Sequence, residues 1–358
     1  MGRRVKEDHI VTVLFFLVSG EHPSLPFSET KAILEAEGFS YKILEELTHV
    51  LRVQADVECL KAVKLRASMM RAGGIEFFNC RAESKEILKN AKETDFSAFL
   101  DASDSFAVRV KRVRGSSPDV DSLELERRIG EIIYENVEGS KVDLKAPRKT
   151  FFGILTDGRF IFGLKKVQIK AGKFVERGSK EKVFTHSAEM PPKIARCMVN
   201  LAQAKPGDLM LDPFCGTGSF LVEAGLIGCR VLGFDVLRSM VEGSLRNLAR
   251  YKIKLEGLAV ADTRHLPLPE KSVDCVATDP PYGTSSTTLG LSRKDVFETF
   301  LATISRYIKP GRRICLAAPK TVGVKEIGER TGFKHLQSHL IYVHRSLTRE
   351  IAVFELPR

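Results

Sequence analysis

Apolar residues in the first part of the chain alternate between strand-like and helix-like spacing, which predicts two small α+β units. In the first unit, strands over 10–18 and 48–57 flank a helix over 28–38, with Ser28 as its expected N-cap. A second helical stretch covers 57–72. The second unit is predicted to hold a helix near 82–92, a strand over 106–112, a helix over 122–134 with Leu123 on its apolar side, and strands over 141–146 and 151–163.

The pattern changes after Pro191 and Pro192, where apolar strands begin to alternate with amphipathic helices. This alternation predicts an open, mostly parallel sheet. The last two strands, 335–344 and 349–356, are close enough to form a hairpin and to add an antiparallel strand. The other elements are predicted at 208–212, 219–228, 231–236, 238–251, 257–262, 273–279, 293–308 and 312–318.

Composition restricts the class of protein. The chain has 358 residues, of which 43% are hydrophobic, so it can form two or three domains with real cores. Its seven cysteines include no Cys-x-x-Cys pair, which predicts reduced thiols, a cytoplasmic location and no metal site. The apolar run 10–18 is too short to span a bilayer and is followed by no Ala-x-Ala cleavage site, so it is read as a buried strand.

The positive charge is concentrated in the middle of the chain. The formal net charge is +11, and the segment 141–182 alone contributes +8. Such a run fits either a solvated linker or a surface that binds phosphates. Asp157 and Gly158 predict a tight hairpin within it. The phenylalanines interleaved with the charges fit core positions better than base-stacking platforms: Phe151, Phe152, Phe160, Phe162 and Phe174.

A glycine-containing turn follows the strand at 208–212. The segment 209–220, LMLDPFCGTGSF, runs from an apolar strand through Gly216 and Gly218 into a helix. Glycines there let a ligand approach the backbone. A dinucleotide-binding turn usually has a third glycine three residues later, where this chain has Leu221, so a pyrophosphate site is disfavoured.

Four aspartates stand at or near the ends of predicted strands: Asp212, Asp235, Asp262 and Asp279. A single aspartate after a strand is most often a turn or cap residue. Four of them in one parallel sheet should meet in one crevice, because the carboxyl ends of the strands share an edge. Such a crevice suits a cationic, sugar-bearing ligand, with Asp235 on ribose hydroxyls and Asp262 on an adenine amine.

The motif Asp279-Pro280-Pro281-Tyr282-Gly283 is the sharpest chemical signal. The two prolines lack N–H groups, so the stretch presents chiefly acceptors, the Asp279 carboxylate and the Pro280 carbonyl. Two acceptors can bind both hydrogens of an exocyclic amine and stabilise it as the nitrogen becomes tetrahedral. Tyr282 would stack on a flipped-out base. The alternative is a structural Pro-Pro turn.

Residues 183–358 resemble class I S-adenosylmethionine-dependent methyltransferases of the amino-methylating, Asp-Pro-Pro-Tyr type. The segments 184–196 (FTHSAEMPPKIAR) and 344–349 (HRSLTR) are similar to the archaeal and eukaryotic tRNA (guanine(10)-N2)-methyltransferase family. This resemblance implies an α/β Rossmann-like domain, with a seven-stranded, mostly parallel sheet and an antiparallel terminal hairpin. It implies a ferredoxin-like α+β unit over 1–80, a THUMP RNA-binding domain over 81–165, a linker over 166–183 and a methyltransferase domain over 184–358.

The resemblance also implies the activity and its residues. The reaction would be methylation of the N2 amine of guanosine 10 in tRNA, once or twice, with S-adenosylmethionine as cofactor. The expected catalytic residues are Asp279, Pro280, Pro281 and Tyr282. The expected cofactor-binding residues are His186, Asp212, Cys215, Gly216, Thr217, Gly218, Asp235 and Asp262. The expected RNA-binding residues are Lys145, Arg148, Lys149, Lys165, Lys166, Arg345 and Arg349.

Two other functions remain open on the sequence. A nucleic-acid adenine-N6 methyltransferase would share the Asp279 motif and the cofactor, but it would not need a basic RNA-type N-terminal half. A non-catalytic RNA-binding protein is opposed by the intact motif. The family resemblance implies tRNA as partner, gripped at its single-stranded 3′ end by the THUMP domain. Some family members also act with a small zinc-binding activator protein that pairs along the methyltransferase sheet.

Overall fold

The computed structural model describes residues 11–101, 103–170, 172–179, 181–187, 189–282 and 292–358. The chain forms two compact units, each built from separate stretches of sequence. The N-terminal unit contains the chain up to Pro23 together with Phe39–Lys64 and Met70–Ile169. The C-terminal unit contains Ser24–Gly38, Leu65–Met69 and Lys170–Arg358. Among the described helices, none has the length and apolar character that crossing a membrane requires.

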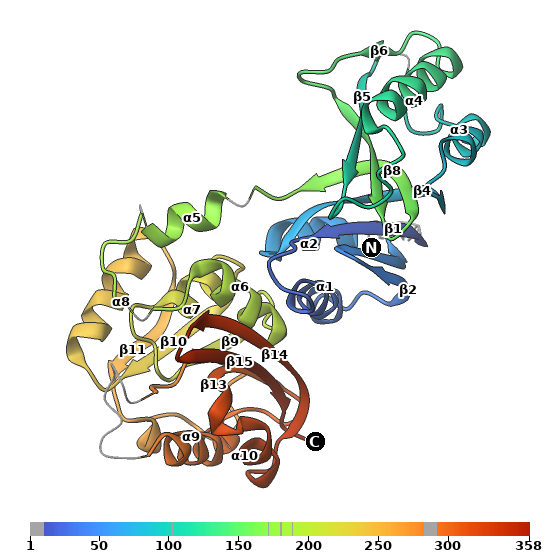
Figure 1. Cartoon of the computed structure of the whole chain (residues 1–358). Helices are drawn as coiled ribbons and strands as arrows, with labels where there is room; N and C mark the ends of the chain where they lie inside the picture. Colours follow the sequence, from blue (N-terminus) through green and yellow to red (C-terminus); the bar gives the residue numbers. More distant parts are fainter. Residues whose placement is uncertain (1–10, 102, 171, 180, 188, 283–291) are drawn as a thin grey trace, which may run out of the picture. The chain divides into compact units, whose positions relative to one another are not determined.

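One eight-stranded sheet runs through the N-terminal unit, in the order β2-β3-β1-β4-β8-β7-β5-β6 (Figure 1). The long strand β4 joins its two halves, because it pairs with β1 on one side and with β8 on the other. The expected boundary between 80 and 81 therefore lies near the end of a strand in a continuous sheet. The strands are β1 (Val11–Val18), β2 (Tyr41–Leu47), β3 (Val50–Asp56), β4 (Met70–Arg81), β5 (Ser105–Arg112), β6 (Lys141–Val142), β7 (Lys149–Thr156) and β8 (Arg159–Gln168).

Three helices accompany this sheet: α2 (Cys59–Arg66), α3 (Ser84–Glu93) and α4 (Ser122–Asn136). Apolar residues of α3 and α4 pack with the phenylalanines of β7 and β8 in one core. Phe151, Phe160 and Phe162 are fully buried, which confirms the prediction that they are core residues. The predicted hairpin is also confirmed, since β7 and β8 meet at Asp157 and Gly158, both with positive φ.

A seven-stranded sheet forms the centre of the C-terminal unit, in the order β11-β10-β9-β12-β13-β15-β14. Strands β9 to β13 pair in parallel, and β15 and β14 add the antiparallel hairpin, so the predicted fold class is confirmed. The strands are β9 (Leu209–Asp212), β10 (Arg230–Asp235), β11 (Leu255–Val260), β12 (Cys275–Thr278), β13 (Arg313–Pro319), β14 (Lys334–His344) and β15 (Leu347–Glu355).

Helices cover both faces of this sheet (Figure 1). Met210 on β9 faces the core formed with α1, α6, α7 and α8, whereas the next residue, Leu211, faces the core formed with α9 and α10. This alternation explains why the strands are almost continuously apolar. The helices are α1 (Leu25–Ala36), α5 (Gly172–Ser179), α6 (Pro192–Leu201), α7 (Ser219–Gly225), α8 (Arg238–Arg250), α9 (Arg293–Tyr307) and α10 (Val324–Arg330), with short 3₁₀ turns η1 (Thr263–His265) and η2 (Lys320–Val322).

Helix α1 comes from the N-terminal part of the sequence but packs in the C-terminal unit, against α6. Its buried Glu29 accepts hydrogen bonds from the backbone N–H of Ser68 and Met69, at 2.9 and 2.7 Å, and from Asn200 Nδ2 on α6 at 2.9 Å. A buried carboxylate with several donors is stabilised where it lies. Helix α1, the segment Leu65–Met69 and helix α6 are thus held together in the C-terminal unit, although they are far apart in the sequence.

Several local predictions were wrong. Ser28 is not an N-cap: α1 begins at Leu25, after Ser24 and with Pro26 in its first turn, and the Ser28 hydroxyl donates to Gln337 instead. Leu123 is 75% exposed, and Leu125 takes the buried position on α4. The predicted helix over 57–72 ends at Arg66, and β4 was missed.

Candidate active site

A cleft of about 1310 Å³ opens at the carboxyl edge of the seven-stranded sheet. Its walls come from the turns after the parallel strands, from the segment before α6 and from the β14–β15 hairpin. Three of the four strand-end aspartates line it, namely Asp235, Asp262 and Asp279. The fourth, Asp212, is fully buried and is not among the lining residues.

The turn after β9 is held open by glycines and by Asp235 at the end of β10. Gly216 and Gly218 have φ of 49° and 81°, which L side chains rarely adopt. Asp235 Oδ2 accepts from the Gly216 N–H at 2.9 Å, and Oδ1 accepts from the Leu237 N–H at 2.9 Å. Burial raises the pKa of Asp235, although these backbone donors favour the ionised form. Each carboxylate oxygen keeps a lone pair for a ligand hydroxyl.

Asp212 stabilises the site from behind. Its Oδ1 accepts from Thr278 Oγ1 at 2.7 Å and from the Phe214 N–H at 3.2 Å, which ties β9 to β12. Its Oδ2 is buried without a hydrogen-bond partner in the described structure. Burial raises the pKa of Asp212 to about 7, and the charges of Asp235 and Asp279 act in the same direction.

Asp262 is paired within its own turn. The Arg264 guanidinium contacts both carboxylate oxygens, with Nε 2.9 Å from Oδ2 and 3.1 Å from Oδ1. This hydrogen bonding lowers the pKa of Asp262. Both side chains line the cleft, so a ligand amine that reaches Asp262 meets Arg264 as well.

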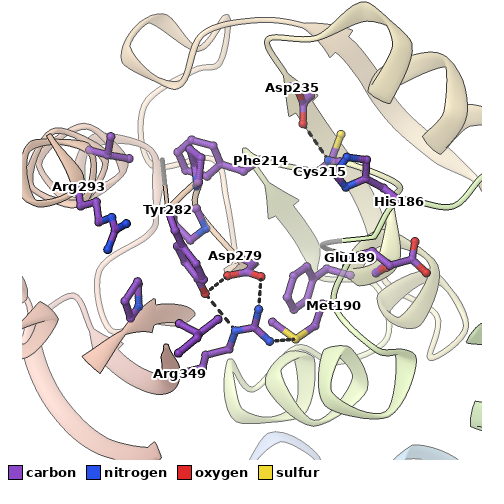
Figure 2. Close-up of a pocket in the computed structure, with 18 of the residues that line it drawn as sticks. His186, Glu189, Met190, Phe214, Cys215, Asp235, Asp279, Tyr282, Arg293 and Arg349 are labelled. Atoms are coloured by element: carbon purple, nitrogen blue, oxygen red, sulfur yellow. Dashed lines mark hydrogen bonds and ion pairs between the residues drawn. The ribbon is translucent and has the colours of Figure 1, made fainter. Parts of the chain in front are cut away.

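Asp279 follows β12 and lies in the middle of the cleft beside Tyr282 and Arg349 (Figure 2). The Tyr282 hydroxyl donates to Asp279 Oδ1, and an Arg349 NH2 nitrogen lies 3.4 Å from Oδ2. Burial raises the pKa of Asp279 to about 6, while Arg349 and the Tyr282 hydroxyl oppose that shift. Pro280 and Pro281 also line the cleft, and Gly283 lies outside the described residues.

A buried ionic cluster supports the glycine turn and was not foreseen from the sequence. Thr217 Oγ1 donates to Glu189 Oε2 at 2.8 Å. Lys182 Nζ lies 3.0 Å from the same oxygen and 2.8 Å from Ser219 Oγ, and its side chain is only 2% exposed. His186, in the same segment, lines the cleft, as Cys215 does (Figure 2). Burial raises the pKa of the Cys215 thiol, so it stays neutral.

The expected RNA-binding residues divide between the two units. Lys145, Arg148 and Lys166 are exposed on the N-terminal unit. Lys149 is bound to Asp104, and Lys165 lies 5.8 Å over the Phe152 ring.

The last two expected RNA-binding residues, Arg345 and Arg349, line the cleft of the C-terminal unit. Arg345 is exposed, whereas the Arg349 side chain is 12% exposed and touches Asp279.

Fold and site together define a class I methyltransferase, whose methyl donor is S-adenosylmethionine. The residues present fit that cofactor, because the glycine turn leaves the backbone open above β9. Apart from the two residues adjacent to Gly216 in the chain, no described residue lies closer than 4.0 Å to where a Gly216 side chain would begin. The Asp235 carboxylate lines the same cleft, and each of its oxygens can accept a further hydrogen bond from a ligand. The sequence matches the THUMP domain family over residues 81–164 and the RMKL-like methyltransferase domain family over residues 179–351.

Relatives define the family. The chain is 38% identical to the tRNA (guanine(10)-N2)-dimethyltransferase of Methanothermobacter thermautotrophicus, across 96% of this chain and 99% of that protein. It is 29% identical to the enzyme of the same name from Methanocaldococcus jannaschii, across 95% and 99%. The chain belongs to this family of THUMP-containing methyltransferases.

Solved structures support the fold. TrmN from Thermus thermophilus is similar with a TM-score of 0.54 at 20% identity, across 96% of this chain and 99% of that one. SMU.472, solved in complex with SAH, gives a TM-score of 0.53 at 14% identity, across 97% and 99%. At these identities the likeness concerns the fold alone.

Proposed function

We propose that the protein transfers methyl groups from S-adenosylmethionine to the exocyclic N2 amine of guanosine 10 in tRNA. The observation that carries the proposal is the similarity, over nearly the full length, to archaeal enzymes named for that reaction, together with the placement of the Asp279 motif inside the cleft. The THUMP domain and the basic segment 141–182 support RNA over duplex DNA as substrate.

Asp279 has the central part in this reaction. Its carboxylate and the Pro280 carbonyl accept the two N–H groups of the target amine, whose lone pair is delocalised into the guanine ring. These hydrogen bonds strengthen as the nitrogen becomes tetrahedral, so they stabilise the transition state more than the bound substrate. Tyr282, from the same turn, stacks on the flipped-out base.

The cofactor supplies an electrophilic methyl group on a sulfonium. Asp235 accepts its ribose hydroxyls, and Cys215, Gly216, Thr217 and Gly218 shape the backbone around its methionine end. The ionic cluster of Lys182 and Glu189 keeps Thr217 in place. His186 and Asp262 bound the same cleft.

The size of the cleft supports a site for two ligands at once. Pockets for one small molecule usually measure about 300–1,000 Å³, and this cleft exceeds that range at about 1310 Å³. The relatives from Methanothermobacter thermautotrophicus and Methanocaldococcus jannaschii are named dimethyltransferases, so we include dimethylation in the proposal.

The N-terminal unit binds the tRNA in this proposal. Its exposed cations are accessible to phosphate: Lys145 and Arg148 lie between β6 and β7, and Lys166 lies on β8. Lys149 and Lys165 lie on β7 and β8. Arg345, exposed at the rim of the cleft, would contact phosphate near the target nucleotide.

Nucleoside mass spectrometry tests the proposal. Unmodified tRNA transcript is incubated with the enzyme and S-adenosylmethionine, digested and analysed for N2-methylguanosine and N2,N2-dimethylguanosine. A transcript with adenosine at position 10 is the matched control and should stay unmethylated. Methylation of adenine, of duplex DNA or of the control transcript would overturn the assignment.

Partner and location complete the proposal. We expect the protein to act in the cytoplasm, where its substrate tRNA is found. A small zinc-binding activator protein would pair along the edge of the methyltransferase sheet, where β11 is an edge strand and Val260 is 52% exposed. Methyl transfer that rises when such a protein is added would support this pairing, and an unchanged rate would count against it.

A further inference from the structure

Arg349 lies against the centre of the active site, although it stands far from the Asp279 motif in sequence. Strand β15 runs antiparallel to β13, and its register places Arg349 opposite Pro319, at the carboxyl edge of the sheet. The Arg349 side chain is 12% exposed. Its guanidinium reaches Asp279 at 3.4 Å, the Tyr282 hydroxyl at 3.1 Å and Met190 Sδ at 3.7 Å (Figure 2).

Asp279 has other carboxylates near it. Asp212 lies behind it on β9, and Asp235 bounds the same cleft from β10. Among the described residues, Arg349 is the one cation within 4 Å of the Asp279 carboxylate. Other ionisable side chains line the cleft from further elements: His186, Glu189, Arg293, Lys320, His344 and Arg345.

Tyr282 interacts with the same carboxylate, that of Asp279, that the target amine needs as its acceptor. Its hydroxyl donates to Asp279 Oδ1 and accepts from Arg349 Nε, and the Arg349 guanidinium lies 5.7 Å from the centre of the Tyr282 ring. The three side chains therefore satisfy one another while no base is bound. A carboxylate oxygen has two lone pairs, so the Tyr282 hydroxyl leaves room on Asp279 for an N–H of the target amine.

We propose that Arg349 is a positioning residue for methyl transfer: it keeps the Asp279 carboxylate ionised and oriented, both directly and through the Tyr282 hydroxyl that it holds on that carboxylate. The inference rests on the proposed function for the identity of the amine. It gives Arg349 a role at the reacting group, in place of a contact to tRNA phosphate.

Burial already raises the pKa of Asp279, and Arg349 opposes that shift. Loss of the guanidinium should therefore raise the pKa further, by about 1 or more, since a close opposite charge typically moves a carboxyl pKa by about 1–3. The active form of Asp279 is ionised, so the acidic limb of the rate profile should move to higher pH.

The experiment compares the wild-type enzyme with Arg349→Met and Arg349→Lys. The rate constant kcat is measured on tRNA between about pH 5 and pH 9, and the affinity for tRNA is measured separately. Arg349→Met should lose about 5-fold or more in kcat near pH 6, because a pKa raised by about 1 from about 6 leaves roughly a tenth of Asp279 ionised there, and much less near pH 9. Arg349→Lys should recover part of the loss, because it restores the charge but not the two-pronged geometry. Arg330→Met on α10, which removes a surface pair with Glu298 3.7 Å away, is the matched control and should leave the profile unchanged.

A second readout needs neither tRNA nor methyl transfer. In protein labelled with ¹³C at the aspartate carboxyl, the Asp279 signal is identified by its absence in Asp279→Asn and titrated in each Arg349 variant. A higher pKa in Arg349→Met supports the proposal even if no methylated product forms, in which case the proposed function alone has failed. An unmoved pKa with kcat reduced equally at all pH values overturns it, and so does an unmoved pKa with weakened tRNA binding, which would mark a phosphate contact.

Discussion

At the scale of single residues, the site is built on four aspartates that differ in burial and in hydrogen-bond partners. Asp279 and Asp235 line the cleft, Asp262 is paired with Arg264, and Asp212 is buried behind them. All four end or follow a strand, so their positions along the chain do not distinguish them. Burial and partners do, and these set which carboxylate can accept a ligand hydrogen bond.

Asp279→Ala should reduce methyl transfer by about 100- to 1000-fold, the usual loss when one transition-state hydrogen-bonding group is removed. Affinities for S-adenosylmethionine and for tRNA should change little, since Asp279 acts on the reacting amine. Single-turnover kinetics and separate binding titrations measure both effects. A loss of tRNA affinity as large as the loss in rate would refute the assignment.

Asp235→Ala should weaken S-adenosylmethionine binding by about 1.5–3 kcal/mol, because it removes a charge-assisted acceptor. The variant also frees the Gly216 N–H, which Asp235 holds at 2.9 Å. Calorimetry measures the affinity. Glu256→Ala, on exposed surface of β11 and paired with Arg230, is the matched control and should bind normally. Equal affinity in the Asp235 variant and the control would place the ribose elsewhere.

The raised pKa of Asp212 implies that the stability of the folded protein depends on pH. Its pKa is about 7 in the folded protein and near 3.8 in an unfolded chain, so the native state binds the proton more tightly. The stabilisation from this proton is complete below about pH 4 and is lost as pH rises through about 7. Asp212→Asn, which needs no proton, should gain stability relative to the wild type as pH rises from about 5 to 8. Denaturant titrations at several pH values measure this, and a constant difference between the two proteins would contradict it.

At the scale of elements, helix α1 shows how packing overrides position in the sequence. Local patterning predicted a helix over 28–38, and the structure shifts it to Leu25–Ala36. Its place in the C-terminal unit depends on Glu29, whose acceptors meet donors from Ser68, Met69 and Asn200. None of these contacts is visible as a local pattern.

Glu29→Gln should destabilise the C-terminal unit by about 1–3 kcal/mol, because an amide NH₂ would face donors in a buried site. Chemical denaturation monitored by circular dichroism measures the change. Glu35→Gln is the matched control on the same helix: Glu35 is exposed, its pair with Arg313 is 3.2 Å long, and such surface pairs contribute about 0–1 kcal/mol. A similar effect for both variants would show that Glu29 is not an anchor.

Elements with local signals were predicted well, and those without were not. The Asp157–Gly158 turn and the alternating strands and helices after Pro192 are encoded by neighbouring residues. Strand β4 was missed because Gly73 and Gly74 interrupt its pattern. Those glycines are required by tertiary contact: a side chain on Gly74 would meet the Leu164 backbone oxygen at 2.1 Å.

At the scale of the whole molecule, the basic segment 141–182 and a catalytic unit are joined in one chain. If about six of the basic residues in 141–182 contact phosphate, the logarithm of the tRNA affinity should fall with the logarithm of salt concentration at a slope of about −4 to −5. Removing the 3′ terminal nucleotides of the tRNA should reduce methylation sharply, although guanosine 10 is intact. Filter binding and methylation assays on full-length and trimmed tRNA measure these effects. Full activity on the trimmed tRNA would show that the basic stretch binds without regard to the 3′ end.

The sequence by itself determined most of the elements after Pro192, the fold class of the C-terminal half and three aspartates that line its cleft. These depend on local rules, namely the period of apolar residues, the torsional freedom of glycine and the loss of N–H groups at Pro280 and Pro281. Only the tertiary structure decided that α1 joins the C-terminal unit, that Asp212 is hidden behind the cleft and that Arg349 binds Asp279. Each of these depends on which distant residues meet, and therefore on desolvation and pairing that no local pattern records.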